Sequence, residues 1–127
     1  MTNLAQQFAD RLTELEASGD VDSFVSAVFA DDTELVRPET RQQLTDHDGA
    51  HRFWTEYLSQ FTKVQSTFNR VHYSDIGVLE WTSSAQLAHG TDITYAGVSL
   101  LDFNDQGQVS RFCTYYDTRV FQPNPGS

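Results

Sequence analysis

The sequence predicts an α+β domain in which three amphipathic helices cover one face of an antiparallel sheet. Apolar residues recur at helical spacing in the first half of the chain, whereas residues 65–120 divide into four strand-like segments joined by short polar turns. Consecutive hairpins give an antiparallel sheet, and helices that precede such a meander pack together on one of its faces. The chain has 127 residues without a linker or repeat, which predicts one domain at 1–121 and a frayed tail at 122–127.

The three helices are predicted from apolar faces and end signals. The first carries Leu4, Phe8, Leu12 and Leu15 at near-helical spacing, and it stops at Gly19, which tolerates the left-handed conformation of a helix C-terminus. The second follows the N-cap candidates Asp20 and Asp22 and ends near Ala30. The third has an aromatic stripe over Ala50–Phe61, with Asp48 as its N-cap.

The strands follow from alternation and from turn residues. A short strand at Thr33–Arg37 is halted by Pro38, and the polar loop Glu39–Asp46 is of the kind that borders a pocket mouth. The four later strands are predicted at Gln65–Ser74, Ile76–Leu87, Ile93–Phe103 and Val109–Val120.

Charge and cysteine content exclude several classes of function. The formal net charge is −10 and no Lys/Arg cluster occurs, which argues against binding to a phosphate backbone. No apolar run approaches the ~20 residues that a spanning helix needs, so no membrane insertion is expected. A single cysteine, Cys113, and an N-terminus without a secretion signal predict a reduced, cytoplasmic protein. His47 and His51 fall short of the ligand set of a catalytic zinc site, and we expect no metal or other cofactor.

Three turn and cap motifs carry a resemblance to a known superfamily. They are Gly19-Asp20, Phe29-Ala30-Asp31-Asp32 and the segment Asp102–Val109. With the element order above, they make the chain similar to the nuclear transport factor 2-like superfamily, which includes SnoaL-like and ketosteroid isomerase-like domains. The resemblance implies a cone-shaped α+β barrel whose wide end holds a pocket for a small hydrophobic ligand. It also implies a homodimer formed through the outer face of the sheet.

The resemblance does not carry over the catalytic residues of two enzyme types. Where ketosteroid isomerases have a base and two oxyanion donors, the alignment of these motifs puts Arg37, Leu12 and Ser99. Where limonene-epoxide hydrolases have their second carboxylate it puts Thr114, and no arginine stands in the strand around Glu80. The isomerase mechanism is not predicted because arginine cannot act as a base at neutral pH. The epoxide hydrolase mechanism is not predicted because threonine is not an acid and its arginine is missing.

Strand parity transferred from the superfamily predicts the residues that line the pocket. These substrate-binding candidates are Arg37, Trp54, Ser99, Leu101, Phe112, Thr114 and Tyr116.

Two interpretations of the strand 76–87 compete. Alternation puts Leu79, Trp81, Ala85 and Leu87 on the core side, whereas an ungapped alignment through Gly90 turns Val78, Glu80, Thr82, Ser84 and Gln86 inward. The second, which we favour, makes Glu80 and His72 the candidates for general acid–base catalysis. The alternative is a Glu80 that pairs with Arg37 or stays exposed.

Two functions follow from these observations. The first is a SnoaL-like isomerase, cyclase or hydrolase that acts on a small hydrophobic molecule in an aromatic pocket. The second is a non-catalytic, ligand-binding or accessory homodimer, which the departure from known catalytic residues favours.

Overall fold

The computed structural model describes residues 3–117 and 121, and the elements named here belong to that part of the chain. The helices are α1 (Leu4–Ser18), α2 (Val21–Val28) and α3 (Asp46–Leu58), with a 3₁₀ turn at Pro38–Thr40. The strands are β1 (Phe29–Arg37), β2 (Gln42–Thr45), β3 (Phe61–Tyr73), β4 (Gly77–Leu87), β5 (Asp92–Phe103) and β6 (Val109–Tyr116). The predicted α+β class, with three helices ahead of a sheet meander, is confirmed. The predicted tail at 122–127 lies outside the described residues.

The sheet is mixed rather than wholly antiparallel. Its strand order is β2-β1-β6-β5-β4-β3, and β1 runs parallel to β6 while the other neighbouring pairs are antiparallel. The hairpin turns predicted the meander from β3 to β6 correctly. They carry no information on where the separate strand β1 joins the sheet, and this is why the parallel pair was missed.

Several predicted boundaries need correction near the first strand and the third helix. β1 begins directly at Phe29, and the predicted loop at 39–46 contains the edge strand β2. Helix α3 starts at Asp46 rather than near Ala50, because the Asp46 carboxylate accepts a hydrogen bond from the Gly49 N–H at 3.0 Å. Asp48 is therefore not the N-cap. The end of α1 is as predicted: Gly19 has φ 73° and its N–H donates to the Leu15 carbonyl.

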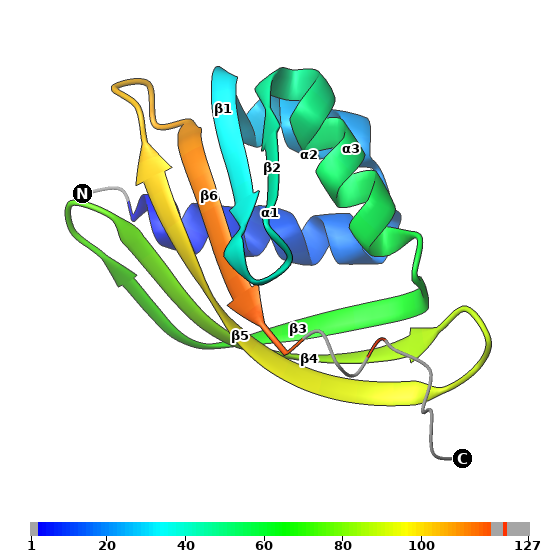
Figure 1. Cartoon of the computed structure of the whole chain (residues 1–127). Coiled ribbons are helices and arrows are strands. Elements are labelled where there is room, and N and C mark those ends of the chain that lie inside the picture. Colours follow the sequence, from blue (N-terminus) through cyan, green and yellow to red (C-terminus); the bar gives the residue numbers. More distant parts are fainter. Residues whose placement is uncertain (1–2, 118–120, 122–127) are drawn as a thin grey trace.

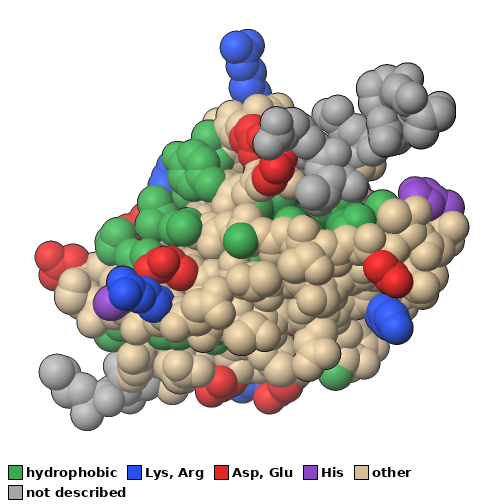
Figure 2. Space-filling view, turned by 90° about the horizontal axis from the view of Figure 1, so that it is seen from below, with side chains coloured by type: hydrophobic (Ala, Val, Ile, Leu, Met, Phe, Trp, Pro, Cys, Tyr) green, Lys and Arg blue, Asp and Glu red, His purple; other side chains and the backbone are tan. Residues whose placement is uncertain are grey.

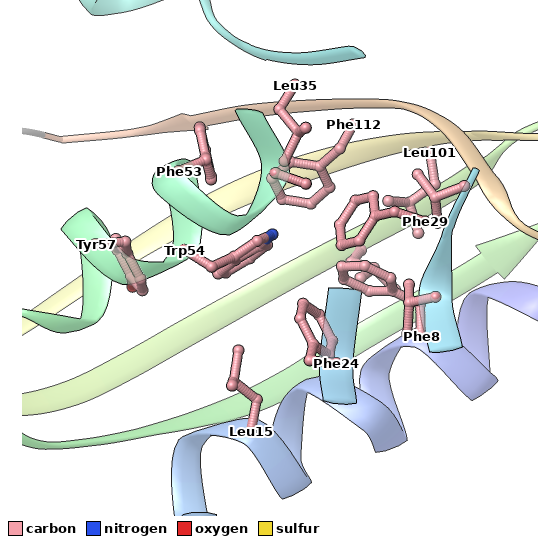
Figure 3. Close-up of a cluster of buried hydrophobic side chains, with 14 of the residues drawn as sticks. Phe8, Leu15, Phe24, Phe29, Leu35, Phe53, Trp54, Tyr57, Leu101 and Phe112 are labelled. Carbon is pink, nitrogen blue, oxygen red and sulfur yellow. The ribbon is translucent and has the colours of Figure 1, made fainter. Parts of the chain in front are cut away.

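The sheet curves around the helices, which lie in its concave side (Figure 1). Helix α1 crosses the sheet, and α2 and α3 lie side by side next to β1. Between these layers is a core of aromatic rings, in which Figure 3 shows the Trp54 indole between Tyr57 and a group of phenylalanines. The Trp54 ring centroid is 5.3 Å from those of both Phe24 and Phe112. Each such buried aromatic side chain contributes about 1.5–3 kcal/mol of transfer free energy.

A close contact between β4 and β5 fixes the position of Trp81. Gly97 lies opposite Trp81 in the β4–β5 ladder, and a Cβ atom built at Gly97 would stand 2.4 Å from the indole Cζ2. Only a residue without a side chain leaves room for the ring there. The indole consequently lies flat on the inner surface of the sheet, where it reaches the cavity described next.

Candidate active site

A small cavity lies between α1, α3 and the inner face of the sheet. Its volume is about 30 Å³, enough to hold about one water molecule. Six of its thirteen lining residues are aromatic, and the full lining is Leu12, Glu16, Arg37, Phe53, Trp54, Tyr57, Ser66, Trp81, Ser83, Ser99, Phe112, Thr114 and Tyr116.

The structure brings six of the seven predicted binding residues into this lining. They are Arg37, Trp54, Ser99, Phe112, Thr114 and Tyr116, and their alternation along β5 and β6 matches the predicted parity. Leu101 also faces inward, but it is fully buried in the hydrophobic core beside Gly77 and does not line the cavity.

The two predicted acid–base residues lie on the opposite face of the sheet. Along β4 the buried positions are Gly77, Leu79, Trp81, Ser83, Ala85 and Leu87, so the interpretation that turns Glu80 inward is wrong. The Glu80 carboxylate is 3.9 Å from the Arg70 guanidinium, and its side chain is 45% exposed. His72 on β3 is exposed too. The error arose because an ungapped alignment shifted β4 by one residue, which exchanges the two faces of a strand.

Glu16 on α1 is the carboxylate that does line the cavity. The Ser66 N–H and hydroxyl donate to its two oxygens at 2.8 and 2.5 Å. Burial raises the pKa of Glu16, and the two hydrogen bonds from Ser66 oppose that rise. Sequence reasoning missed this residue, although a signal exists: Glu16 continues the series Leu4, Phe8 and Leu12 at four-residue spacing. It therefore shares the buried face of the helix.

Two buried donors in the wall have no hydrogen-bond partner among the described residues. They are the indole Nε1 of Trp54 and the guanidinium Nε of Arg37. Arg37 lies at the end of β1, and its guanidinium carbon is 4.9 Å from the ring centroid of Phe53 and 5.3 Å from that of Tyr116. Leaving a buried donor unpaired costs about 1–3 kcal/mol. The cavity is therefore equipped to bind an acceptor atom.

Several other polar groups of the wall are hydrogen-bonded to neighbouring side chains. The Trp81 indole N–H donates to Ser99 Oγ at 3.0 Å, and Ser99 Oγ lies 2.9 Å from Thr114 Oγ1. Tyr57 on α3 is hydrogen-bonded through its hydroxyl to that of Tyr95 on β5. Burial raises the pKa of both tyrosines, which keeps them protonated near neutral pH.

Comparison with known proteins gives the chain its family. The family model of the SnoaL-like domain matches residues 7–112, most of the chain. The chain belongs to the SnoaL-like family. A search of curated proteins found no match.

Solved structures share the fold of this SnoaL-like domain at low sequence identity. An NTF2-like protein of unknown function from Burkholderia pseudomallei K96243 has TM-score 0.79 and 19% identity over 94% of this chain and 95% of that one. A protein from Jannaschia sp. CCS1, provisionally named a SnoaL-like polyketide cyclase, has TM-score 0.77 and 14% identity over 98% of both chains. A protein with a ketosteroid isomerase-like fold from Catenulispora acidiphila DSM 44928, solved with trimethylamine, has TM-score 0.76 and 12% identity over 87% and 85%.

The positions singled out by the resemblance lie together in this SnoaL-like domain. Leu12, Arg37 and Ser99, which the sequence motifs were predicted to put at catalytic positions of ketosteroid isomerases, all line the cavity, and so does Thr114. Within the described residues, no group of three or more His, Cys, Asp and Glu side chains is arranged to hold a metal ion. None of the described helices combines the length and apolarity needed to span a membrane.

Proposed function

We propose that this SnoaL-like domain is a small-molecule enzyme that transfers a proton at a carbon next to a carbonyl group, with Glu16 as general acid and base. The observation that carries the proposal is that Glu16 is the one carboxylate among the described residues of the cavity wall. A carboxyl group in an apolar site has a pKa moved toward neutrality, where one group can both accept and return a proton.

The unpaired donors of Trp54 and Arg37 supply the second requirement of such a reaction. Removing a proton next to a carbonyl builds negative charge on the carbonyl oxygen, and donors fixed in a water-poor site stabilise that charge. Trp54 Nε1 and Arg37 Nε are buried and have no partner among the described residues, so a substrate oxygen would satisfy them. The provisional name of the Jannaschia structure, cyclase, denotes a chemistry that uses such proton transfers.

Substrate entry requires the cavity to enlarge. Its volume of about 30 Å³ is far below the roughly 300–1,000 Å³ of typical ligand pockets. Arg37 is partly exposed, and it covers the rings of Phe53 and Tyr116. Cation–π contacts contribute only about 0.5–2 kcal/mol each, so displacing the Arg37 side chain while a substrate enters costs little.

Deuterium exchange tests the proposed chemistry without knowledge of the natural substrate. A panel of cyclic and aryl ketones is incubated in D₂O with the protein, and loss of the α-proton signal is followed by NMR. We expect exchange of at least one ketone above the buffer rate, and a decrease of about 10²–10⁴-fold in Glu16→Gln. Glu80→Gln is the matched control and retains the wild-type rate. Exchange that survives in Glu16→Gln would refute the role of Glu16.

The small cavity also favours a second function, a non-catalytic or accessory protein. A cavity that holds only about one water molecule is not a preformed substrate site. A molecule that co-purifies with the protein, is released on denaturation and is chemically unchanged by prolonged incubation would support this function over the enzyme.

A homodimer through the outer sheet face forms part of both functions. On that face the partly buried Val78 and Leu100 are partners across β4 and β5, and Tyr115 on β6, the partner of Val98, is 46% exposed. Figure 2 shows hydrophobic side chains gathered on one side of this surface, and uncharged side chains and backbone over most of the rest. Exposed apolar side chains gathered in this way are typical of an interface.

A further inference from the structure

Two serines on neighbouring strands lie next to Glu16 at the cavity wall. Ser66 on β3 and Ser83 on β4 are partners in the β3–β4 ladder, so their side chains leave the same face of the sheet side by side. Both line the cavity together with Glu16. Ser83 has no exposed surface, and bulk water therefore does not compete for its hydroxyl.

The Ser66 hydroxyl makes two side-chain contacts but has a single proton. Its oxygen lies 2.5 Å from Glu16 Oε2 and 2.6 Å from Ser83 Oγ, at the short end of the range for O–H···O hydrogen bonds. An ionised carboxylate only accepts hydrogen bonds, so the Ser66 proton points to Glu16. The other contact then has one arrangement, in which Ser83 donates its proton to the Ser66 oxygen.

The direction of these hydrogen bonds determines how Ser83 affects Glu16. A hydroxyl that accepts a hydrogen bond becomes a stronger donor, by about 10–30% per bond. The bond from Ser83 also holds the Ser66 hydroxyl in the rotamer that donates to Glu16. Hydrogen bonds donated to a carboxylate favour its charged form. Ser83 therefore favours the ionised state of Glu16 through Ser66.

We propose that Ser83 is a positioning residue for the acid–base group: it donates to Ser66, fixes the Ser66 proton on Glu16, and so holds the carboxylate ionised at the cavity wall. This inference rests on the proposed role of Glu16. The Ser66 N–H, 2.8 Å from Glu16 Oε1, belongs to the backbone and does not depend on Ser83. Ser83 thus acts on one of the two carboxylate oxygens, Oε2.

The other titratable side chains of the cavity wall keep their charge while Glu16 titrates. They are Arg37 from β1, Tyr57 from α3 and Tyr116 from β6, with Tyr95 of β5 hydrogen-bonded to Tyr57. Arginine stays cationic, and burial raises the pKa of each of the three tyrosines, which remain neutral. Among the described lining residues, β3 and β4 contribute no titratable side chain. A change in the Glu16 transition in a serine variant is therefore not caused by a second titration in the wall.

NMR titration of the free protein measures the ionisation of Glu16 in serine variants. Glutamate Cδ is labelled with ¹³C, and the Glu16 signal is assigned by its loss in Glu16→Gln. We expect the Glu16 midpoint to rise in Ser83→Ala and to rise further in Ser66→Ala, which removes the direct hydrogen bond. Ser99→Ala is the matched control, because Ser99 is a buried serine of the same wall that bonds to other side chains, and it leaves the midpoint unchanged. An unchanged midpoint in folded Ser83→Ala overturns the proposal.

A double-mutant cycle separates an action through Ser66 from a general effect of the substitution. In the Ser66→Ala background no Ser66 hydroxyl remains for Ser83 to orient, so we expect Ser83→Ala to cause no further rise of the Glu16 midpoint. An equal rise in both backgrounds would refute the positioning role.

A second variant covers the case in which Ser83→Ala does not fold. Ser83→Cys keeps a side chain of similar size whose thiol is only a weak donor. We expect the Glu16 midpoint to rise in this variant too, by a smaller amount, and a midpoint that stays in place counts equally against the proposal.

The pH profile of ketone exchange shows whether Ser83 matters for the reaction. On the acidic side of the Glu16 midpoint we expect exchange in Ser83→Ala to be about 2–4-fold slower than in the wild type, because less Glu16 is ionised. At higher pH the two rates converge. A structural defect alone would lower the rate at every pH and leave the midpoint of the profile in place. Ser84→Ala, at an exposed serine on the opposite face of β4, is the control and keeps the wild-type profile.

The role of Ser83 and the proposed function fail in different ways. An unchanged Glu16 midpoint in Ser83→Ala, combined with ketone exchange that is lost in Glu16→Gln, removes the role of Ser83 and keeps Glu16 as the acid–base residue. Exchange that is unaffected by Glu16→Gln removes the proposed function, whatever the midpoint does in the serine variants.

Discussion

Replacing Gly97 with alanine tests how Trp81 is held against the sheet. The new methyl group would lie 2.4 Å from indole Cζ2, 2.8 Å from Cη2 and 2.5 Å from the Tyr115 carbonyl oxygen. Carbon atoms pack at about 3.5–4.0 Å, so the ring must move by about 1 Å. Such overpacking costs about 1–3 kcal/mol, and the displaced indole also loses the hydrogen bond to Ser99, about another 1 kcal/mol.

The expected loss for Gly97→Ala is therefore about 2–4 kcal/mol of unfolding free energy, out of the roughly 5–15 kcal/mol of a typical domain. Urea denaturation followed by far-UV circular dichroism measures it, and tryptophan fluorescence reports the movement of the indole. Ala96→Ser is the matched control on the exposed side of β5, with an expected change within about 0.5 kcal/mol. A Gly97→Ala protein as stable as the Ala96→Ser control would show that Trp81 does not lie over Gly97.

Three further predictions concern Glu16 and the outer sheet face. Ser66→Ala removes a hydrogen bond that favours the carboxylate, so the pKa of Glu16 rises further, as ¹³C NMR titration would record; an unchanged pKa contradicts the contact. The native state holds the Glu16 proton more tightly than the unfolded chain, so the unfolding free energy falls as pH rises from the unfolded pKa of 4.5 through the native pKa. In denaturation experiments at several pH values, Glu16→Gln removes this part of the pH dependence. An equal pH dependence in both proteins would refute burial of the carboxyl group. Leu100→Glu dissociates the proposed homodimer in light-scattering measurements, whereas Thr94→Glu, farther along the same face of β5, leaves it intact; a dimer that survives Leu100→Glu forms elsewhere.

The sequence contained most of the fold because its signals are local. Alternation and turn residues predicted β3 to β6. The helical spacing of the apolar residues around Phe8 in α1 and around Trp54 in α3 predicted the buried faces that form the core. The parallel contact between β1 and β6 was not predictable in this way, since the two strands are about 80 residues apart and no turn joins them. The start of α3 was missed because Asp46 has φ 62°, a conformation that few residues other than glycine adopt.

The candidate site was predictable where side chains could be placed by strand parity. Ser99, Phe112 and Thr114 line the cavity as strand parity predicted, because they share the inward face of β5 and β6. The same reasoning failed for Glu80, since one residue of error in register reverses every side chain of a strand. Glu16 was overlooked because a carboxylate on an amphipathic helix is ordinarily taken as part of the solvated face.

The positions of Glu16 and Arg37 define how a substrate would lie in the cavity. Arg37 comes from β1 and Ser66, which holds Glu16, comes from β3; β6, β5 and β4 separate these two strands in the sheet. Under the proposed function, the acceptor-binding Arg37 and the strand that holds the acid–base residue Glu16 therefore lie on opposite sides of the central strands of the sheet. A ketone whose oxygen binds between Arg37 and Trp54 would direct its neighbouring carbon across the cavity toward Glu16. Its apolar body would then contact Phe112, and this arrangement favours substrates with one polar end.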